Sequence, residues 1–393
     1  MNEIVTAIVD EKFDVGLRLT QMRAWLDEWR KEDEQLRARL RHLDRDKPMD
    51  RQLGEQIGRL RKRLKAMRVR EPLEIAIGTQ EGKAGERYRL IRQNLMVQFA
   101  ALPKEDRIMW LDNFLFIMTP DIWKLHKKVK KVLDYNTLGQ QRNFLLGGYS
   151  GMGKSTYLNW LSALNLPVVQ ERRNYVPVIK VDAPVSNITP KSLLQRMLLD
   201  CGLTYLKGDS EEDLLMKLDL YLQQCDVELI IVDEIEHISR PDMRRRLLDI
   251  SNMTQGIPII CASCNPTMWV VGDVEVAGRW NDYFELPQYL GERLSDLLVF
   301  IETLLPFSKQ SHLARQKVGV GAGAIQGPAK LIQQWTGGIL RDIMILIRDA
   351  SRQAIERNLP CLSPELLEEI WNSIQESRVT DFGRQQNREA DDE

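Results

Sequence analysis

The sequence predicts an α/β domain with a parallel sheet, placed between two helical regions. From about residue 143 to residue 262, short apolar runs typical of strands alternate with helical stretches, and this alternation favours a parallel sheet. Residues 19–67 instead repeat apolar side chains at steps of three and four, which is typical of amphipathic helices. After residue 286 the pattern becomes helical again and stays so to about residue 374.

The composition and charge of the 393-residue chain exclude several classes of protein. No apolar run approaches the roughly 18 residues that cross a bilayer, so we expect no integral membrane protein. The acidic N-terminus lacks the apolar stretch of a signal peptide, and five cysteines do not form a disulfide framework, which predicts a cytoplasmic protein. Because 55 Lys and Arg residues nearly balance 56 Asp and Glu residues, any nucleic-acid binding must come from local basic surfaces.

Residues 1–115 are predicted to form a helical N-terminal extension that contains a helical hairpin. Its apolar seam comprises Leu19, Met22, Leu26, Trp29, Leu36, Leu40 and Leu43, then Leu53, Ile57, Leu60, Leu64 and Met67. The turn signal Asp46-Lys47-Pro48 separates the two series, which favours two antiparallel helices. The basic residues at the far end are Arg59, Arg61, Lys62, Arg63, Lys65, Arg68 and Arg70. They form either a solvated flank or a nucleic-acid contact.

The α/β domain is expected to span residues 116–286. Its predicted strands are 143–146, 175–181, 229–232 and 257–262, and its predicted helices are 154–164, 190–201, 211–224 and 241–254. A helical C-terminal region is expected over 287–375, followed by a polar, disordered tail over 376–393.

A glycine-rich segment follows the first predicted strand and opens the next predicted helix. It reads Gly148-Tyr149-Ser150-Gly151-Met152-Gly153-Lys154-Ser155, which fits the phosphate-binding loop G-x-x-x-x-G-K-[ST]. Its glycines let backbone N–H groups point at phosphate oxygens, and the helix start adds its positive end. Lys154 is expected to reach the β- and γ-phosphates of ATP, and Ser155 to ligate Mg²⁺. With Thr156 these residues form the predicted nucleotide-binding set; an incidental glycine turn is the alternative.

Two acidic residues end the most apolar predicted strand, in Leu229-Ile230-Ile231-Val232-Asp233-Glu234. Such a strand is buried on both faces of a parallel sheet and delivers its last residues to the edge where ligands bind. Asp233 is the predicted Mg²⁺ ligand of a Walker B motif, and Glu234 is placed to polarise a water for attack on the γ-phosphate. The alternative is that both acids only cap the next helix.

A third candidate lies at the end of the strand predicted over 257–262, in Cys261-Ala262-Ser263-Cys264-Asn265-Pro266. A polar side chain there would sit between the two Walker elements and contact the γ-phosphate or the attacking water. Asn265 is the predicted residue, with Ser263 as the second choice. The spacing of Cys261 and Cys264 also fits a zinc or redox pair, but the chain has no second such pair and only four histidines, which argues against that interpretation.

These motifs together resemble the AAA+ superfamily: a Walker A loop, an Asp-Glu Walker B strand, a polar sensor and a C-terminal helical lid. Within it, LLGGYSGMGKST, LIIVDEIEHI and AGRWNDYFELPQY resemble the TniB/TnsC family of transposition ATPases. The resemblance covers about residues 120–375. It identifies the segment 287–375 as the lid, and it leaves the long N-terminal arm as an extension that shorter family members lack.

The resemblance implies two arginines at the active site. Arg279, just before the lid, matches the arginine finger that a neighbouring subunit supplies, and arginine suits this role because its fork can bind two phosphate oxygens. Arg341, in Gly337-Gly338-Ile339-Leu340-Arg341-Asp342, resembles the sensor-2 residue that faces the nucleotide from its own subunit. For each of them, the alternative is a surface salt bridge.

The resemblance also points to DNA contacts. The loop after the second strand contains Ser186, Asn187, Thr189 and Lys191, and the next turn contains Lys207 and Ser210. One cation per subunit is weak by itself, but a helical assembly repeats the contact along the duplex. The basic run Arg240, Arg244, Arg245 and Arg246 could touch either DNA or a neighbouring subunit.

The resemblance implies a cytoplasmic ATPase that binds ATP and Mg²⁺ and hydrolyses ATP as a switch. It would form a homo-oligomer, as a ring or a helical filament, on double-stranded DNA. There it would link a target-site selector protein to the transposase. The alternatives are a helicase-loader or origin-type AAA+ ATPase, and a signalling P-loop NTPase that acts on protein partners only.

Overall fold

The computed structural model describes residues 6–391, except for 45, 65–70, 76–83, 114–117, 138–141, 170–173, 184–188, 239, 255, 266–268, 270, 272 and 315–326. The chain divides into two compact units. The sheet unit contains Arg23–Glu71 and Met118–Pro287. The helical unit contains Thr6–Met22, Pro72–Ile117 and Gln288–Glu393.

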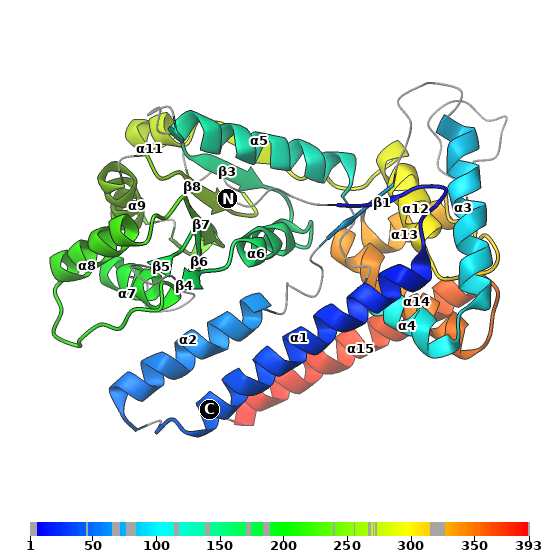
Figure 1. The fold of residues 1–393 in the computed structure, drawn as a ribbon, viewed down its shortest axis with the longest axis horizontal. Helices are drawn as coiled ribbons and strands as arrows, with labels where there is room; N and C mark the ends of the chain where they lie inside the picture. Colours follow the sequence, from blue (N-terminus) through cyan, green and yellow to red (C-terminus); the bar gives the residue numbers. More distant parts are fainter. Residues whose placement is uncertain are drawn as a thin grey trace. The chain divides into compact units, whose positions relative to one another are not determined.

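The sheet unit is built on a five-stranded, all-parallel sheet (Figure 1). Its strands are β3 (Phe144–Gly147), β6 (Val178–Asp182), β7 (Leu229–Asp233), β8 (Ile259–Ala262) and β9 (Asp282–Glu285). They lie in the order β6-β7-β8-β3-β9. The α/β fold class and four of these strands are therefore confirmed. The sequence did not predict β9, because its four residues carry an acid at each end and no apolar run.

The helices between these strands begin and end within one residue of their predicted bounds. They are α6 (Lys154–Leu164), α7 (Pro190–Asp200), α8 (Glu211–Gln224) and α9 (Pro241–Met253). Helix α5 (Pro120–Thr137) precedes the sheet, η2 (Ile235–Ile238) follows β7, and α11 (Val274–Arg279) leads into β9. A small antiparallel pair, β4 (Val168–Val169) and β5 (Asn174–Tyr175), lies between α6 and β6 in the sequence.

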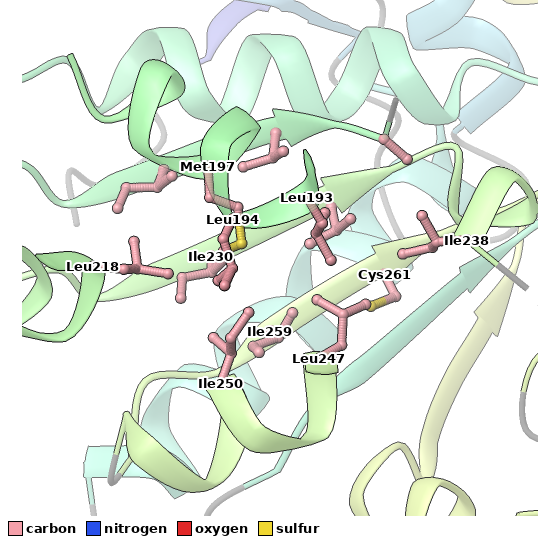
Figure 2. Close-up of a cluster of buried hydrophobic side chains, with 14 of the residues drawn as sticks. Leu193, Leu194, Met197, Leu218, Ile230, Ile238, Leu247, Ile250, Ile259 and Cys261 are labelled. Atoms are coloured by element: carbon pink, nitrogen blue, oxygen red, sulfur yellow. The ribbon is translucent and has the colours of Figure 1, made fainter. Parts of the chain in front are cut away.

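A large apolar core fills one face of the sheet (Figure 2). Leu194 and Met197 of α7 and Leu247 of α9 pack against Ile230 of β7 and Ile259 of β8. Because successive residues of a strand point to opposite faces, the intervening residues of β6 and β7 lie on the other face. That second face includes Lys180, Asp182 and Asp233.

The N-terminal arm forms the predicted helical hairpin. Its helices are α1 (Val15–Arg41) and α2 (Pro48–Leu64), which lie side by side in Figure 1. The seam is apolar, with Leu36 and Ile57 buried in it. The guanidinium of Arg61 also reaches across the hairpin to Asp33, at 2.6 Å, and this bond lowers the pKa of that carboxyl.

Helix α2 is attached to the α/β domain by polar contacts. The side chain of Gln52 donates to the carbonyl of Tyr205, and that of Gln56 donates to the carbonyl of Leu203. Arg59 pairs with Asp200 at the end of α7, at 3.1 Å. Helix α2 and the part of α1 that it packs against thus belong to the sheet unit.

The basic end of α2 faces the protein itself where the structure describes it. Arg59 and Arg61 are each paired with a carboxylate of this chain. The side chains of Lys62 and Arg63, and residues 65–70, lie outside the described part.

In the helical unit, helices of the predicted lid pack against helices from the N-terminal region. Its helices are α3 (Ala84–Ala101), α4 (Lys104–Asn113), α12 (Glu292–Leu304), α13 (Pro328–Thr336), α14 (Leu340–Glu356) and α15 (Pro364–Asp391), with a parallel strand pair, β1 (Ala7–Val9) and β2 (Leu73–Ile75). The buried indole of Trp110 donates to the carbonyl of Leu304, at 2.7 Å. Arg352 pairs with Asp112. The predicted extension 1–115 is therefore divided between the two units.

The C-terminal segment differs from the prediction. Helix α15 runs to Asp391, whereas a disordered tail was predicted over 376–393. The prediction rested on the lack of apolar residues, but the Glu, Arg, Gln and Ala residues of this segment favour continuation of a helix. No helix in the described part of the chain is long and apolar enough to span a membrane.

Candidate functional site

The phosphate-loop segment has a backbone that only glycine tolerates well. Gly148, Gly151 and Gly153 have φ angles of 136°, 83° and 96°, and side chains rarely adopt such positive values. At Gly148 a Cβ atom would lie 2.8 Å from the carbonyl oxygen of Leu286. These glycines therefore set the path of the loop between β3 and α6.

Lys154 is held inside this loop. The residue is only 7 % exposed, and its ammonium donates to the carbonyls of Gly148 and Tyr149. These partners are neutral groups of the loop itself, so they do not cancel the charge of the lysine. A buried cation with such partners fits a site for an anion.

The start of α6 adds a second element for an anion. Its N-cap is Gly153, which offers no side-chain cap, so the first N–H groups of the helix remain available to a ligand. The side chains of Ser155 and Thr156 are exposed at this end. The predicted nucleotide-binding set therefore lies together at the carboxyl end of β3.

The two predicted Walker B acids differ in their surroundings. Asp233 is 3 % exposed; its Oδ1 accepts the backbone N–H of Glu234, and its Oδ2 lies 3.3 Å from the ammonium of Lys180. Glu234 is exposed and has a φ of 60°, a strained value for a residue with a side chain. Such strain clusters at functional sites, which agrees with a catalytic role for Glu234.

Lys180 is a further charged residue at this edge, which the sequence motifs do not single out. It lies within β6, is only 4 % exposed, and its ammonium bonds Asp182 as well as Asp233. The signal that could have found it is a charged residue inside the apolar strand Val178-Ile179-Lys180-Val181. The apolar pattern of that stretch predicts a strand, but it does not predict that the lysine pairs with Asp233.

The end of β8 lies between the two Walker strands, as predicted, and a side chain that was not predicted, Cys264, lies close to Lys154. The sulfur of Cys264 is 3.7 Å from the Lys154 ammonium. Asn265 is exposed and its backbone N–H donates to the buried hydroxyl of Ser263. This bond makes a tight turn directly after β8.

The thiol of Cys264 has two charged neighbours. Burial raises its pKa, the charge of Lys154 acts to lower it, and Glu236 raises it further. Cys261 is fully buried within β8, and burial also raises its thiol pKa. Among the described residues no group of three or more His, Cys, Asp or Glu side chains could hold a metal.

The oxygen groups at this edge nevertheless fit Mg²⁺ bound with a nucleotide. Asp233 supplies a buried carboxylate and Ser155 an exposed hydroxyl. Mg²⁺ commonly takes one or two protein oxygens and completes its shell with phosphate and water. The carboxylate and the hydroxyl are oxygen ligands of the kind that Mg²⁺ prefers, but two groups do not fill its coordination shell.

The two predicted arginines lie in different units. Arg279 is the exposed last residue of α11, and its carbonyl accepts the backbone N–H of the buried Asn143. Arg341 is exposed in the helical unit, with its Nε 3.4 Å from Asp342. Asp342 also accepts from Arg378. The roles of both arginines toward a nucleotide stay predictions.

The predicted DNA-contact residues divide into three groups. Ser186 and Asn187 lie outside the described residues. Thr189 and Ser210 are N-caps of α7 and α8, and their hydroxyls accept N–H groups of their own helices. Lys207 is exposed and Lys191 is half-buried. Of the described members of this set, only the two lysines therefore present side-chain groups that are not already used as caps.

The basic run after Walker B is largely paired within the chain. Arg240 bonds Asp242 at 2.7 Å, Arg246 bonds Glu211 and Asp249, and Arg244 approaches the carbonyl of Val271 at 3.5 Å. Arg245 is exposed. Two of the four arginines, Arg240 and Arg246, therefore form surface salt bridges.

A comparison with protein families agrees with the predicted AAA+ domain. Residues 137–266 match the AAA domain family, and no curated protein matches the chain. Among solved structures, the chain is similar to the Aeropyrum pernix ORC1 protein in complex with DNA, with 19% identity and a TM-score of 0.49, over 71% of this chain and 72% of that one.

Two further structures show similarity at lower scores. The Aeropyrum pernix ORC2 protein in ADPNP–ADP complexes is 14% identical, with a TM-score of 0.46, over 65% of this chain and 69% of that one. The Thermotoga maritima RuvB Holliday junction branch migration motor is 14% identical, with a TM-score of 0.39, over 64% and 68%. The AAA domain match and the order of the parallel sheet show a P-loop AAA+ fold. These findings identify the AAA+ fold, and they do not distinguish the TniB/TnsC family from other AAA+ families.

Proposed function

We propose that the chain is an ATP-hydrolysing regulator of transposition of the TniB/TnsC type, which assembles on double-stranded DNA. One observation carries the ATPase part: the buried Lys154, the buried Asp233 and the strained Glu234 all lie at the carboxyl edge of one parallel sheet. The transposition part is supported by the motif resemblance over residues 120–375. Its partners would be a transposase and a target-site selector protein.

Each group at this edge has a task in the proposed reaction. The loop N–H groups and Lys154 bind the β- and γ-phosphates of ATP, and Ser155 and Asp233 hold the Mg²⁺. The Mg²⁺, when bound, neutralises charge that develops on the phosphate oxygens. Glu234 accepts a proton from the water that attacks the γ-phosphate. Asn265, after β8, would contact the γ-phosphate or the attacking water as the polar sensor, next to Cys264, which lies beside Lys154.

Oligomerisation and DNA binding are proposed from the same resemblance. Arg279 would reach the γ-phosphate bound to a neighbouring subunit, which couples hydrolysis to assembly in a ring or filament. Lys191 and Lys207 would contact DNA phosphates, and such contacts tolerate any sequence. Hydrolysis would then release the oligomer from DNA.

Nucleotide binding and hydrolysis are tested with two substitutions in the site and one control substitution outside it. Lys154→Ala should abolish binding of a fluorescent ATP analogue, whereas Lys124→Ala, which removes an exposed lysine of α5, should not. Glu234→Gln should bind the analogue but hydrolyse ATP about two to four orders of magnitude more slowly. Unchanged nucleotide affinity in the Lys154→Ala protein would contradict the assignment of the whole site.

Electron microscopy with DNA, with and without a non-hydrolysable ATP analogue, tests the remainder. We expect nucleotide-dependent oligomers on duplexes of unrelated sequence. Assembly on one particular sequence only would favour an origin-type ATPase. Nucleotide binding without any DNA binding would favour a signalling NTPase.

A further inference from the structure

A buried lysine stands between two carboxylates beside the proposed Mg²⁺ site. The Lys180 ammonium bonds Asp182 and lies 3.3 Å from Oδ2 of Asp233. Asp182 and Asp233 are paired across the ladder of β6 and β7, so both acids end neighbouring parallel strands at the same edge. The Lys180 ammonium therefore contacts both carboxylates.

Burial of the charged Lys180 side chain is not explained by a contribution to the stability of the fold. Lys180 and Asp233 are 4 % and 3 % exposed, and a buried ion pair commonly stabilises a fold no better than apolar side chains of the same volume. The strand residues on either side of it, Ile179 and Val181, belong to the apolar core on the opposite face. A charged residue on the site-facing side thus suggests a task at the site.

An ion pair and a hydrogen bond fix the orientation of the Asp233 carboxylate from both sides. Oδ2 faces Lys180, while Oδ1 accepts the N–H of Glu234 at 3.1 Å. Rotation of the carboxylate would break one of these contacts. The same N–H belongs to the residue that we propose as the catalytic base, so the position of Asp233 and that of Glu234 are linked.

We propose that Lys180 is a positioning residue of the Mg²⁺–nucleotide site, which prevents the Asp182–Asp233 pair from taking up a divalent cation before the nucleotide binds. This inference rests on the proposed function, because it assigns the Mg²⁺ ligand role to Asp233. Two adjacent carboxylates are ligands that hard divalent cations prefer, and the ammonium occupies the place between them. The phosphates of the nucleotide supply the additional negative charge and oxygen ligands that such a cation then requires.

The test measures cation binding without nucleotide. Mn²⁺ is titrated into the nucleotide-free protein, and the free ion is followed by electron paramagnetic resonance. Lys180→Met removes the charge but keeps an unbranched side chain, and it should bind Mn²⁺ about tenfold more tightly than the parent or better. Lys180→Met combined with Asp182→Asn should return to the weak binding of the parent, since the second carboxylate is then gone.

Three further measurements make the outcome decisive. Lys180→Arg keeps the charge and should bind Mn²⁺ as weakly as the parent. Lys180→Gln should show the same gain as Lys180→Met, and it replaces that variant if circular dichroism shows Lys180→Met unfolded. Folded Met or Gln variants with unchanged or weaker Mn²⁺ binding would overturn the inference. Failure of the parent to bind ATP with Mg²⁺ would instead refute the proposed function, independently of the Mn²⁺ result.

Discussion

Replacing Gly148 by alanine should destabilise the sheet unit at the phosphate loop. The φ of 136° at this residue lies in a region that side chains rarely occupy, which costs roughly 1–3 kcal/mol. The new Cβ would also lie 2.8 Å from the Leu286 carbonyl oxygen. This backbone cannot yield cheaply, because the N–H of Leu286 donates to the carbonyl of Gly147 at 2.9 Å.

The magnitude follows from these two effects. Overpacking against a fixed group adds roughly 1–3 kcal/mol, so the sum is about 2–6 kcal/mol, a large share of the stability of an ordinary domain. Gly202 is the matched control: its φ is 82°, and nothing lies within 4 Å of the place that a Cβ would take. Gly202→Ala should therefore cost only the backbone preference, about 1–2 kcal/mol.

The assay is urea unfolding followed by tryptophan fluorescence, with hydrogen exchange of peptides from β3 as the local probe. The close approach to Leu286 should add roughly 1–3 kcal/mol to the cost, so at a typical slope of roughly 1–3 kcal/mol per molar urea Gly148→Ala should lower the midpoint by about one molar relative to Gly202→Ala. Its β3 amides should exchange faster, and ATP-analogue affinity should fall. Equal losses in the two variants would refute the argument that close approach to Leu286 requires a glycine.

Three other outcomes are expected. Arg279→Ala should still bind ATP but hydrolyse it about a thousandfold more slowly, or slower still. Mixing this variant with Glu234→Gln should restore part of the activity. If the two variants assemble together without any recovery of activity, Arg279 does not act on the nucleotide of a neighbouring subunit. Lys191→Ala should weaken binding to unrelated duplexes equally and reduce its salt dependence, whereas an effect on one sequence alone would indicate base reading. Burial, followed by the charge of Lys130, lowers the pKa of His126 to about 4. As the pH drops, His126 therefore takes up a proton in the unfolded chain before it does so in the folded one. The free energy of unfolding should fall between about pH 6.5 and pH 4, by at most ~3 kcal/mol, and solvent screening reduces this value. His126→Gln should lose this component of the pH dependence of the urea midpoint, and a variant that keeps it would contradict the assignment.

Much of the fold could be predicted from the sequence, because the relevant signals are local. The four apolar runs and the helices between them are set by periodicity and by neighbours a few residues away, and the structure places them within a few residues of the predicted bounds. The phosphate loop is likewise a contiguous segment, so its glycines, Lys154 and Ser155 could be identified without tertiary information. Strand β9 was missed because its edge position, paired only with β3, is not encoded by an apolar run.

The residues that the sequence could not place are those whose surroundings come from distant segments. Lys180 is a charged residue in an apolar strand, and its partner Asp233 lies in β7, far away in the sequence. Cys264 comes within 3.7 Å of Lys154 because β8 lies next to β3 in the sheet. Arg59 resembles part of a basic surface until α7 supplies Asp200. The sequence alone determined which segments are strands, helices and phosphate loop, since backbone preference and burial pattern act over short ranges. Only the tertiary structure decided which charges meet, because that depends on strand order and on packing between segments far apart in the chain.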